Sequence, residues 1–245
     1  MDKNQIVINT LVFHQELQSG VPQSVMVDWV HELGLKSIEV RREYIKDFEN
    51  ELSDIKNKSL SYGMNVFYSI PDVLYENHLL KIQDFELYCQ EAKEMNCRSI
   101  KLNIGNFDRI IKNDLKAITS LSEKYDVVVR VENDQTEDNG RSVKINNFLS
   151  FVKKQGGNIS FTFDIGNWLF QNEDPVENAK LLYPFVTYIH VKDIDASKKT
   201  VLLNEGIIDW KLILSILPDN VPVAIEYPIL NKEAIVSEVN KLLVT

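Results

Sequence analysis

The fold is decided by the stretch Ile-Ser-Phe-Thr-Phe-Asp at residues 159–164. Side chains alternate between the two faces of a β-strand, so the apolar residues of this stretch share one face and its polar residues share the other. A strand of this kind suits a parallel barrel whose outer face is covered by helices. The stretch therefore predicts a barrel strand that carries Asp164 inward at its carboxyl end.

Three further apolar runs carry a metal-ligand type of side chain at or near their ends, namely Glu132, His190 and Glu226. Together with Asp164 these residues are spaced 32, 26 and 36 positions apart (164−132, 190−164, 226−190), about the length of one strand–helix unit. A parallel barrel brings the carboxyl ends of its strands to one mouth. We therefore expect the four side chains to meet there and to form a divalent-cation site.

Short β-rich runs alternate with helix-forming segments eight times along the chain, and 245 residues is close to the usual size of a (β/α)8 barrel. The pattern predicts a single TIM barrel domain over residues 1–245. The expected strands are 5–11, 37–41, 64–69, 98–103, 126–132, 158–164, 186–192 and 221–226. The expected helices are 21–33, 46–62, 79–95, 109–124, 143–154, 175–182, 210–214 and 232–243.

The same alternation predicts which polar side chains point into the barrel. These are Glu39, Arg41, Lys101, Asn103, Arg130, Glu132, Asp164, His190, Lys192 and Glu226. Burying so many charged groups without partners would be very costly. We expect them to pair with each other, with a metal ion and with a substrate.

Composition narrows the class of partner. The formal net charge of −9 argues against nucleic acid or an anionic membrane, which favour basic surfaces, and a small polar substrate fits better. The two cysteines, Cys89 and Cys97, are too few for a disulfide framework, and the first residues lack the apolar core of a signal peptide. No apolar run approaches the ~20 residues of a membrane span. These features predict a cytoplasmic protein and leave its oligomeric state open, a homo-oligomer included.

Each candidate ligand also has a purely structural interpretation. Asp164 alone could be a helix cap or a solvated loop residue, and His190 alone could be a hydrogen-bonded core histidine. Four such residues with the same strand parity favour a site. Asp193, which follows the strand of His190, is an acidic candidate for the outer partner of that histidine. Gly206 either forms a turn or lets a loop approach a ligand closely.

At these positions the chain resembles the xylose-isomerase-like barrel superfamily, the sugar isomerase and epimerase group that includes ketose 3-epimerases, hydroxypyruvate isomerase and inosose dehydratase. The resemblance spans essentially the whole chain. It rests on Glu132, Asp164-Ile165-Gly166-Asn167, His190-Val191-Lys192-Asp193, Asn204-Glu205-Gly206-Ile207-Ile208-Asp209-Trp210 and Glu226. It implies one divalent cation (manganese, magnesium, cobalt or zinc) held by the residues that match Glu132, Asp164, His190 and Glu226.

One position departs from the family pattern. Family enzymes commonly carry a histidine three residues after the metal-binding aspartate, where it helps to hold a substrate oxygen, and this chain has Asn167 there. An amide can still donate a hydrogen bond, but it cannot titrate near neutral pH.

The leading functional hypothesis is a metal-dependent isomerase or epimerase that acts on a ketose or a related polyol-derived carbonyl compound through an enediolate. Glu132 and Glu226 would be both metal ligands and acid/base groups. The candidate substrate contacts are Glu39, Lys101, Asn167 and Lys192.

Two alternatives stay open at this point. One is a lyase resembling inosose dehydratase, and the other is a catalytically silent sugar-binding relative. A related endonuclease group uses a histidine-rich trinuclear metal site, which the four histidines of this chain cannot supply.

Overall fold

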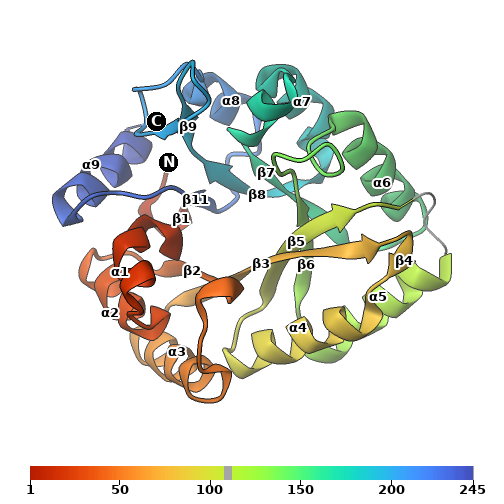
Figure 1. The fold of residues 1–245 in the computed structure, drawn as a ribbon, viewed down its shortest axis with the longest axis horizontal. Coiled ribbons are helices and arrows are strands. Elements are labelled where there is room, and N and C mark those ends of the chain that lie inside the picture. The colour runs from red at the N-terminus through yellow and green to blue at the C-terminus, as the bar shows by residue number, and fades with distance from the viewer. Residues whose placement is uncertain (108–111, 245) are drawn as a thin grey trace.

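The protein forms a closed barrel of parallel strands in a computed structural model that describes residues 1–107 and 112–244 (Figure 1). Neighbouring strands pair in parallel around the ring, and the pairing of β2 with β3 closes it. The barrel strands are β1 (Ile6–Asn9), β2 (Ser37–Arg41), β3 (Asn65–Glu76), β5 (Ser99–Gly105), β6 (Val128–Glu132), β7 (Ile159–Asp164), β8 (Val186–Val191) and β11 (Val223–Ile225). The predicted single (β/α)8 barrel is confirmed.

Helices surround the strands as an outer ring (Figure 1). They are α1 (His14–Ser19), α2 (Gln23–Glu32), α3 (Phe48–Tyr62), α4 (Ile82–Glu94), α5 (Lys112–Tyr125), α6 (Ser142–Lys154), α7 (Pro175–Leu182), α8 (Trp210–Ile216) and α9 (Lys232–Leu243). The predicted start of one helix at Arg109 lies outside the described residues. In the described part of the chain, no helix is long and apolar enough to cross a membrane.

Local chemistry sets several helix ends. Asp174 caps α7 by accepting hydrogen bonds from two backbone N–H groups of its first turn, and Pro175 occupies the first helical position, where it suits the helix. Asp47 caps α3 by accepting a hydrogen bond from the backbone N–H of Asn50. The helix ends at Gly63, which has a left-handed φ of 62° that glycine adopts without steric cost. These caps fix where α7 and α3 begin and where α3 ends.

The largest difference between the predicted and the observed elements is at β3. This strand was expected to end at residue 69, but it continues to Glu76 and then pairs antiparallel with β4 (Leu79–Leu80), a segment predicted as the start of a helix. The observed strand includes Pro71, although proline cannot donate a hydrogen bond to a ladder. The structure accommodates it within a register shift between Ser69 and Val73.

The predicted alternation holds in β7. Phe161 and Phe163 are fully buried, and both rings contact Trp168 in the segment that follows the strand. A separate small apolar cluster consists of Val7, Tyr188 and Ala224, with Phe67 packed against it. Tyr188 has the same strand parity as His190, so the interior of the barrel holds this small apolar cluster together with the polar side chains.

Candidate metal centre and active site

Four candidate ligands converge, as the spacing predicts. Glu132 ends β6, Asp164 ends β7, His190 lies in β8, and Glu226 directly follows β11. Each is buried and offers one ligand atom, and these atoms all lie within 4.8 Å of one another. Side chains from consecutive parallel strands therefore meet at one point, although their separation along the sequence is large.

The imidazole of His190 is central to the group. Its Nδ1 lies 2.6 Å from Oε1 of Glu132 and 3.2 Å from Oε2 of Glu226. Among the described residues, neither ring nitrogen of His190 has a partner with hydrogen-bond geometry, and the same holds for Glu132 Oε1 and Asp164 Oδ2. Buried polar atoms rarely stay unsatisfied. Nitrogen and carboxylate oxygen are ligands of divalent cations, so this donor set fits a metal ion.

Cationic side chains also contact the carboxylates of this group. Lys101 pairs with Glu132. Lys192 Nζ lies 2.6 Å from Asp164 Oδ2 and 3.2 Å from Glu226 Oε2. Arg41 Nη1 lies 2.8 Å from Glu226 Oε1. Buried charges require partners, and these cations keep the carboxylates together.

The surroundings give two of the carboxylates opposite pKa shifts. Burial raises the pKa of Asp164 to about 7, although the nearby Lys192 acts in the opposite direction. Burial also opposes ionisation of Glu226, but His190 and Lys192 outweigh it and lower the pKa of Glu226 well below its usual range. Glu226 is therefore the more strongly stabilised anion of the two.

Backbone N–H groups fix the orientation of Asp164. Its Oδ1 accepts hydrogen bonds from the N–H groups of Gly166 and Asn167, at 2.9 and 3.0 Å, which leaves Oδ2 directed at Lys192. A Cβ on Gly166 would lie 2.5 Å from Cγ of Lys192. The glycine is thus needed where the loop passes close to that side chain.

Asn167 occupies the position at which the family pattern has histidine. Its Nδ2 donates to the carbonyl oxygen of Asn133 at 2.9 Å, and its Oδ1 lies 3.4 Å from Lys192 Nζ. The Asn133 side chain in turn bonds both the N–H and the carbonyl of Asp164. Asn167 therefore links the loop after β7 to the loop after β6 and also contacts Lys192.

Glu39 lies deeper than the other predicted site residues. Its side chain is completely buried, and its Oε2 lies 2.8 Å from Nε2 of His190. The same oxygen accepts a hydrogen bond from Tyr188 Oη at 2.9 Å. Glu39 is therefore on the side of His190 that faces away from Glu132 and Glu226.

Asp193 was expected to support His190, but its carboxylate instead organises the loop that follows. It accepts hydrogen bonds from the backbone N–H groups of Ile194, Asn204, Gly206 and Ile208. A Cβ on Gly206 would lie 2.0 Å from Asp193 Oδ1, so glycine allows the loop to approach this carboxylate. Gly206 therefore lets the loop approach Asp193 of the protein itself.

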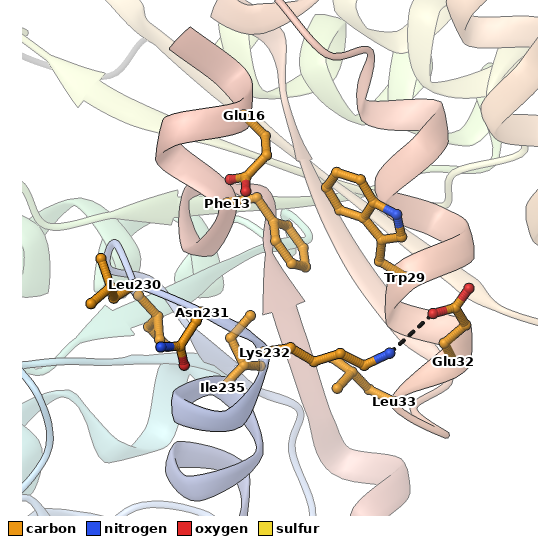
Figure 2. Close-up of a pocket in the computed structure, with 10 residues that line it drawn as sticks. Phe13, Glu16, Trp29, Glu32, Leu33, Leu230, Asn231, Lys232 and Ile235 are labelled. Carbon is orange, nitrogen blue, oxygen red and sulfur yellow. Dashed lines mark hydrogen bonds and ion pairs between the residues drawn. The ribbon is translucent and has the colours of Figure 1, made fainter. Parts of the chain in front are cut away.

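A surface pocket lies apart from this centre. Figure 2 shows it between Phe13 and Trp29 of the N-terminal segments and the start of α9, with Lys232 paired to Glu32 at 3.0 Å. Its volume is about 260 Å³, and it shares no residue with the four-residue group. Its lining includes Glu16, Glu32 and Lys232, and among the described residues none of these belongs to a group that could hold a metal ion.

Sequence reasoning did not assign roles to Asn133 and Tyr188. Asn133 directly follows Glu132, and Tyr188 has the same strand parity as His190. The signals available in the sequence were the position of Asn133 next to a candidate ligand and the shared strand parity of Tyr188 and His190. They place a side chain inside the barrel, but they do not show which neighbour it bonds.

Comparison with known proteins agrees with the barrel fold. The model of the xylose isomerase-like TIM barrel family matches residues 27–242. The chain belongs to this family. Comparison with curated protein sequences finds no match.

Several solved structures share the fold over nearly the whole chain. A xylose isomerase domain-containing protein from Salmonella typhimurium is 13% identical with a TM-score of 0.75, covering 100% of this chain and 99% of that one. A probable 3-DHS dehydratase of petrobactin synthesis from Bacillus anthracis is 18% identical with a TM-score of 0.73, covering 98% and 99%. A D-psicose 3-epimerase is 15% identical with a TM-score of 0.70, covering 96% and 89%. At these identities the likeness concerns the fold.

Proposed function

We propose that this protein is a divalent-metal-dependent isomerase or epimerase of a ketose or related polyol-derived carbonyl compound. One observation carries the proposal: two buried glutamates, Glu132 and Glu226, approach the same nitrogen of His190 from different strands. Similarity in fold to sugar epimerases, including a D-psicose 3-epimerase and an L-ribulose 3-epimerase, supports it.

The metal would be held by Glu132, Asp164, His190 and Glu226. When bound, a divalent cation would polarise the substrate carbonyl and stabilise negative charge on its oxygen. Manganese, magnesium, cobalt and zinc are all compatible with these ligands, because nitrogen and carboxylate donors suit each of them to some degree.

The glutamates would move the proton. One removes a proton from the carbon next to the carbonyl, and the other returns a proton to the opposite face, which gives epimerisation. If the same glutamate returns the proton to the neighbouring carbon, the outcome is aldose–ketose exchange. The lowered pKa of Glu226 keeps its carboxylate ionised, so its oxygens carry no proton before the reaction.

Substrate oxygens would contact the polar side chains that surround the glutamates. Lys101 and Lys192 already contact the carboxylates, and Asn167 contacts Lys192. All three can donate hydrogen bonds to hydroxyl or carbonyl oxygens. The burial of Glu39 against His190 favours a role behind that histidine over the substrate contact predicted for it.

Exchange of carbon-bound hydrogen with solvent tests the proposal. The protein loaded with Mn²⁺ is incubated in D₂O with a panel of ketoses and inososes, and incorporation of deuterium is followed by NMR. We expect exchange on at least one compound and its loss after treatment with EDTA. A protein that binds a ketose of the panel without exchanging any of its hydrogens would be a silent binder, and the proposal would then be wrong.

A dehydratase is the second candidate, favoured by the structural match to a probable 3-DHS dehydratase. The same proton abstraction would then be followed by loss of a β-hydroxyl group. Mass spectrometry of the same reactions separates the two outcomes, because only the lyase forms a product lighter by one water.

A further inference from the structure

On the Nε2 side of His190, the barrel contains a group of contacting side chains to which the proposed reaction assigns no role. Tyr188 precedes His190 by two residues on β8 and so points into the barrel with it. Its ring stacks on Phe67 with centroids 4.8 Å apart, and the guanidinium carbon of Arg130 lies 5.7 Å from its centroid. These contacts hold the Tyr188 hydroxyl in place, where it donates to Glu39.

The two ring nitrogens of His190 face different groups. Nδ1 faces Glu132 and Glu226, whereas Nε2 lies 2.8 Å from Glu39 Oε2. Glu39 is not one of the four residues whose ligand atoms lie together. A metal ion shared with Glu132 and Glu226 would therefore bind Nδ1, which requires the proton of the neutral ring to be on Nε2.

We propose that Glu39, oriented by Tyr188, is the positioning residue that keeps the proton of His190 on Nε2 and presents Nδ1 to the metal. The inference rests on the metal site of the proposed function, although not on its reaction. A carboxylate that accepts from the outer N–H of a metal-binding histidine fixes the tautomer and raises the basicity of the ligating nitrogen. Among the described residues Nε2 has no partner with hydrogen-bond geometry, so its 2.8 Å contact with Glu39 Oε2 is a close approach of two ionisable groups. The complete burial of Glu39 means that no water competes for this contact.

The placement of Glu39 explains why β2 carries two inward charges of opposite sign. Arg41 lies two residues further along the strand, roughly 6.6 Å nearer the mouth, and reaches Glu226. Glu39 reaches only the far side of the histidine. Two residues of β2 thus contact two different candidate ligands: Glu39 contacts His190, and Arg41, nearer the mouth, contacts Glu226.

Nitrogen NMR of the zinc-loaded, ¹⁵N-labelled protein tests the proposal without any substitution. We expect the spectrum of His190 to show Nε2 protonated and Nδ1 bound to zinc. A proton on Nδ1, or zinc on Nε2, would overturn the proposal. If the unaltered protein binds none of zinc, manganese, cobalt and magnesium, the proposed function itself fails, so the two failures are distinguishable.

Metal affinity provides the second readout. We expect Glu39→Gln to bind Zn²⁺ about 10–100-fold more weakly, the usual cost of losing such a partner, and Tyr188→Phe to change affinity in the same direction by less. Glu91→Gln is the matched control, because Glu91 is also buried and also accepts from a tyrosine hydroxyl, that of Tyr68, but lies in α4. Unchanged zinc affinity in a folded Glu39→Gln protein would contradict the proposal. If that variant does not fold, the spectrum of the unaltered protein decides.

Discussion

The two halves of the barrel contribute differently to the site. The second half, from β6 onward, supplies the four candidate ligands. The first half supplies side chains that contact those ligands, namely Glu39 and Arg41 from β2 and Lys101 from β5. Lys192 of the second half adds a further cation. The difference teaches that the anionic group which would carry out the chemistry depends for its charge balance on Arg41 and Lys101 of the first half as well as on Lys192 of its own half.

The largest expected effect comes from the second half, at Glu226. Glu226→Gln keeps an oxygen that can coordinate a cation but cannot accept a proton at working pH. We expect exchange of the substrate C–H to fall by about 100- to 10,000-fold, the range of general-base catalysis, while metal is retained in part. Deuterium exchange and metal analysis measure the two effects separately.

The exposed Glu233→Gln in the first turn of α9 is the control for that experiment and should leave both quantities unchanged. Full exchange by Glu226→Gln would mean that another group moves the proton. Glu132 would then be the next residue to test, and the mechanism with two glutamates would have to be abandoned.

A change in the first half should act on stability instead. Lys101→Met leaves Glu132 buried without its cation, and removing one partner of a buried ion pair typically costs about 3–5 kcal/mol. We expect this loss of unfolding free energy in the metal-free protein, measured by urea denaturation. Bound metal should reduce the loss, because it supplies positive charge to the same carboxylate.

Lys124→Met is the matched control for Lys101→Met, since Lys124 pairs with Glu86 at an exposed site. Exposed pairs contribute only about 0–1 kcal/mol. Equal losses for the two variants would show that the first half of the barrel does not balance the charge of the second.

A smaller effect is expected on metal retention alone. Asp164→Asn replaces an anionic ligand with a neutral amide, and we expect the affinity for Mn²⁺ to fall by at least ~10-fold, since even the outer partners of ligands cost that much. Calorimetric titration measures it. Wild-type affinity in this variant would point to a different ligand set that does not include β7.

The smallest effect is expected at the two cysteines, which lie in the first half away from the site. Burial raises the pKa of both Cys89 and Cys97 to about 12, so both remain thiols at pH 8. We expect little reaction with a thiol reagent in the folded protein and full reaction in urea. Rapid labelling of the native protein would show that this wall of the barrel opens readily.

The sequence was sufficient for the barrel and for the convergence of the four candidate ligands. The spacing of the four residues along the chain predicts that they meet at the mouth of the barrel. The alternation of side chains along each strand predicts which of them point inward. The depth of a side chain was not predictable, because it depends on how neighbouring strands are staggered. Glu39 and Arg41 share parity on β2, yet one lies behind His190 and the other reaches Glu226. The extension of β3 was not predicted, because it depends on a register shift between Ser69 and Val73 that appears only when β3 pairs with β5.

The hydrogen bonds of Asp193 bear on how this protein can change over evolutionary time. They connect the end of the strand that carries His190 to residues 194, 204, 206 and 208. Between these points lies a hairpin formed by β9 (Asp193–Ile194) and β10 (Thr200–Val201), and the chain at its tip, 195–199, is largely exposed. Insertions at an exposed tip are tolerated far better than changes at a bonded backbone. The tip is therefore a place where the loop can gain or lose length while His190 and Lys192 keep their positions.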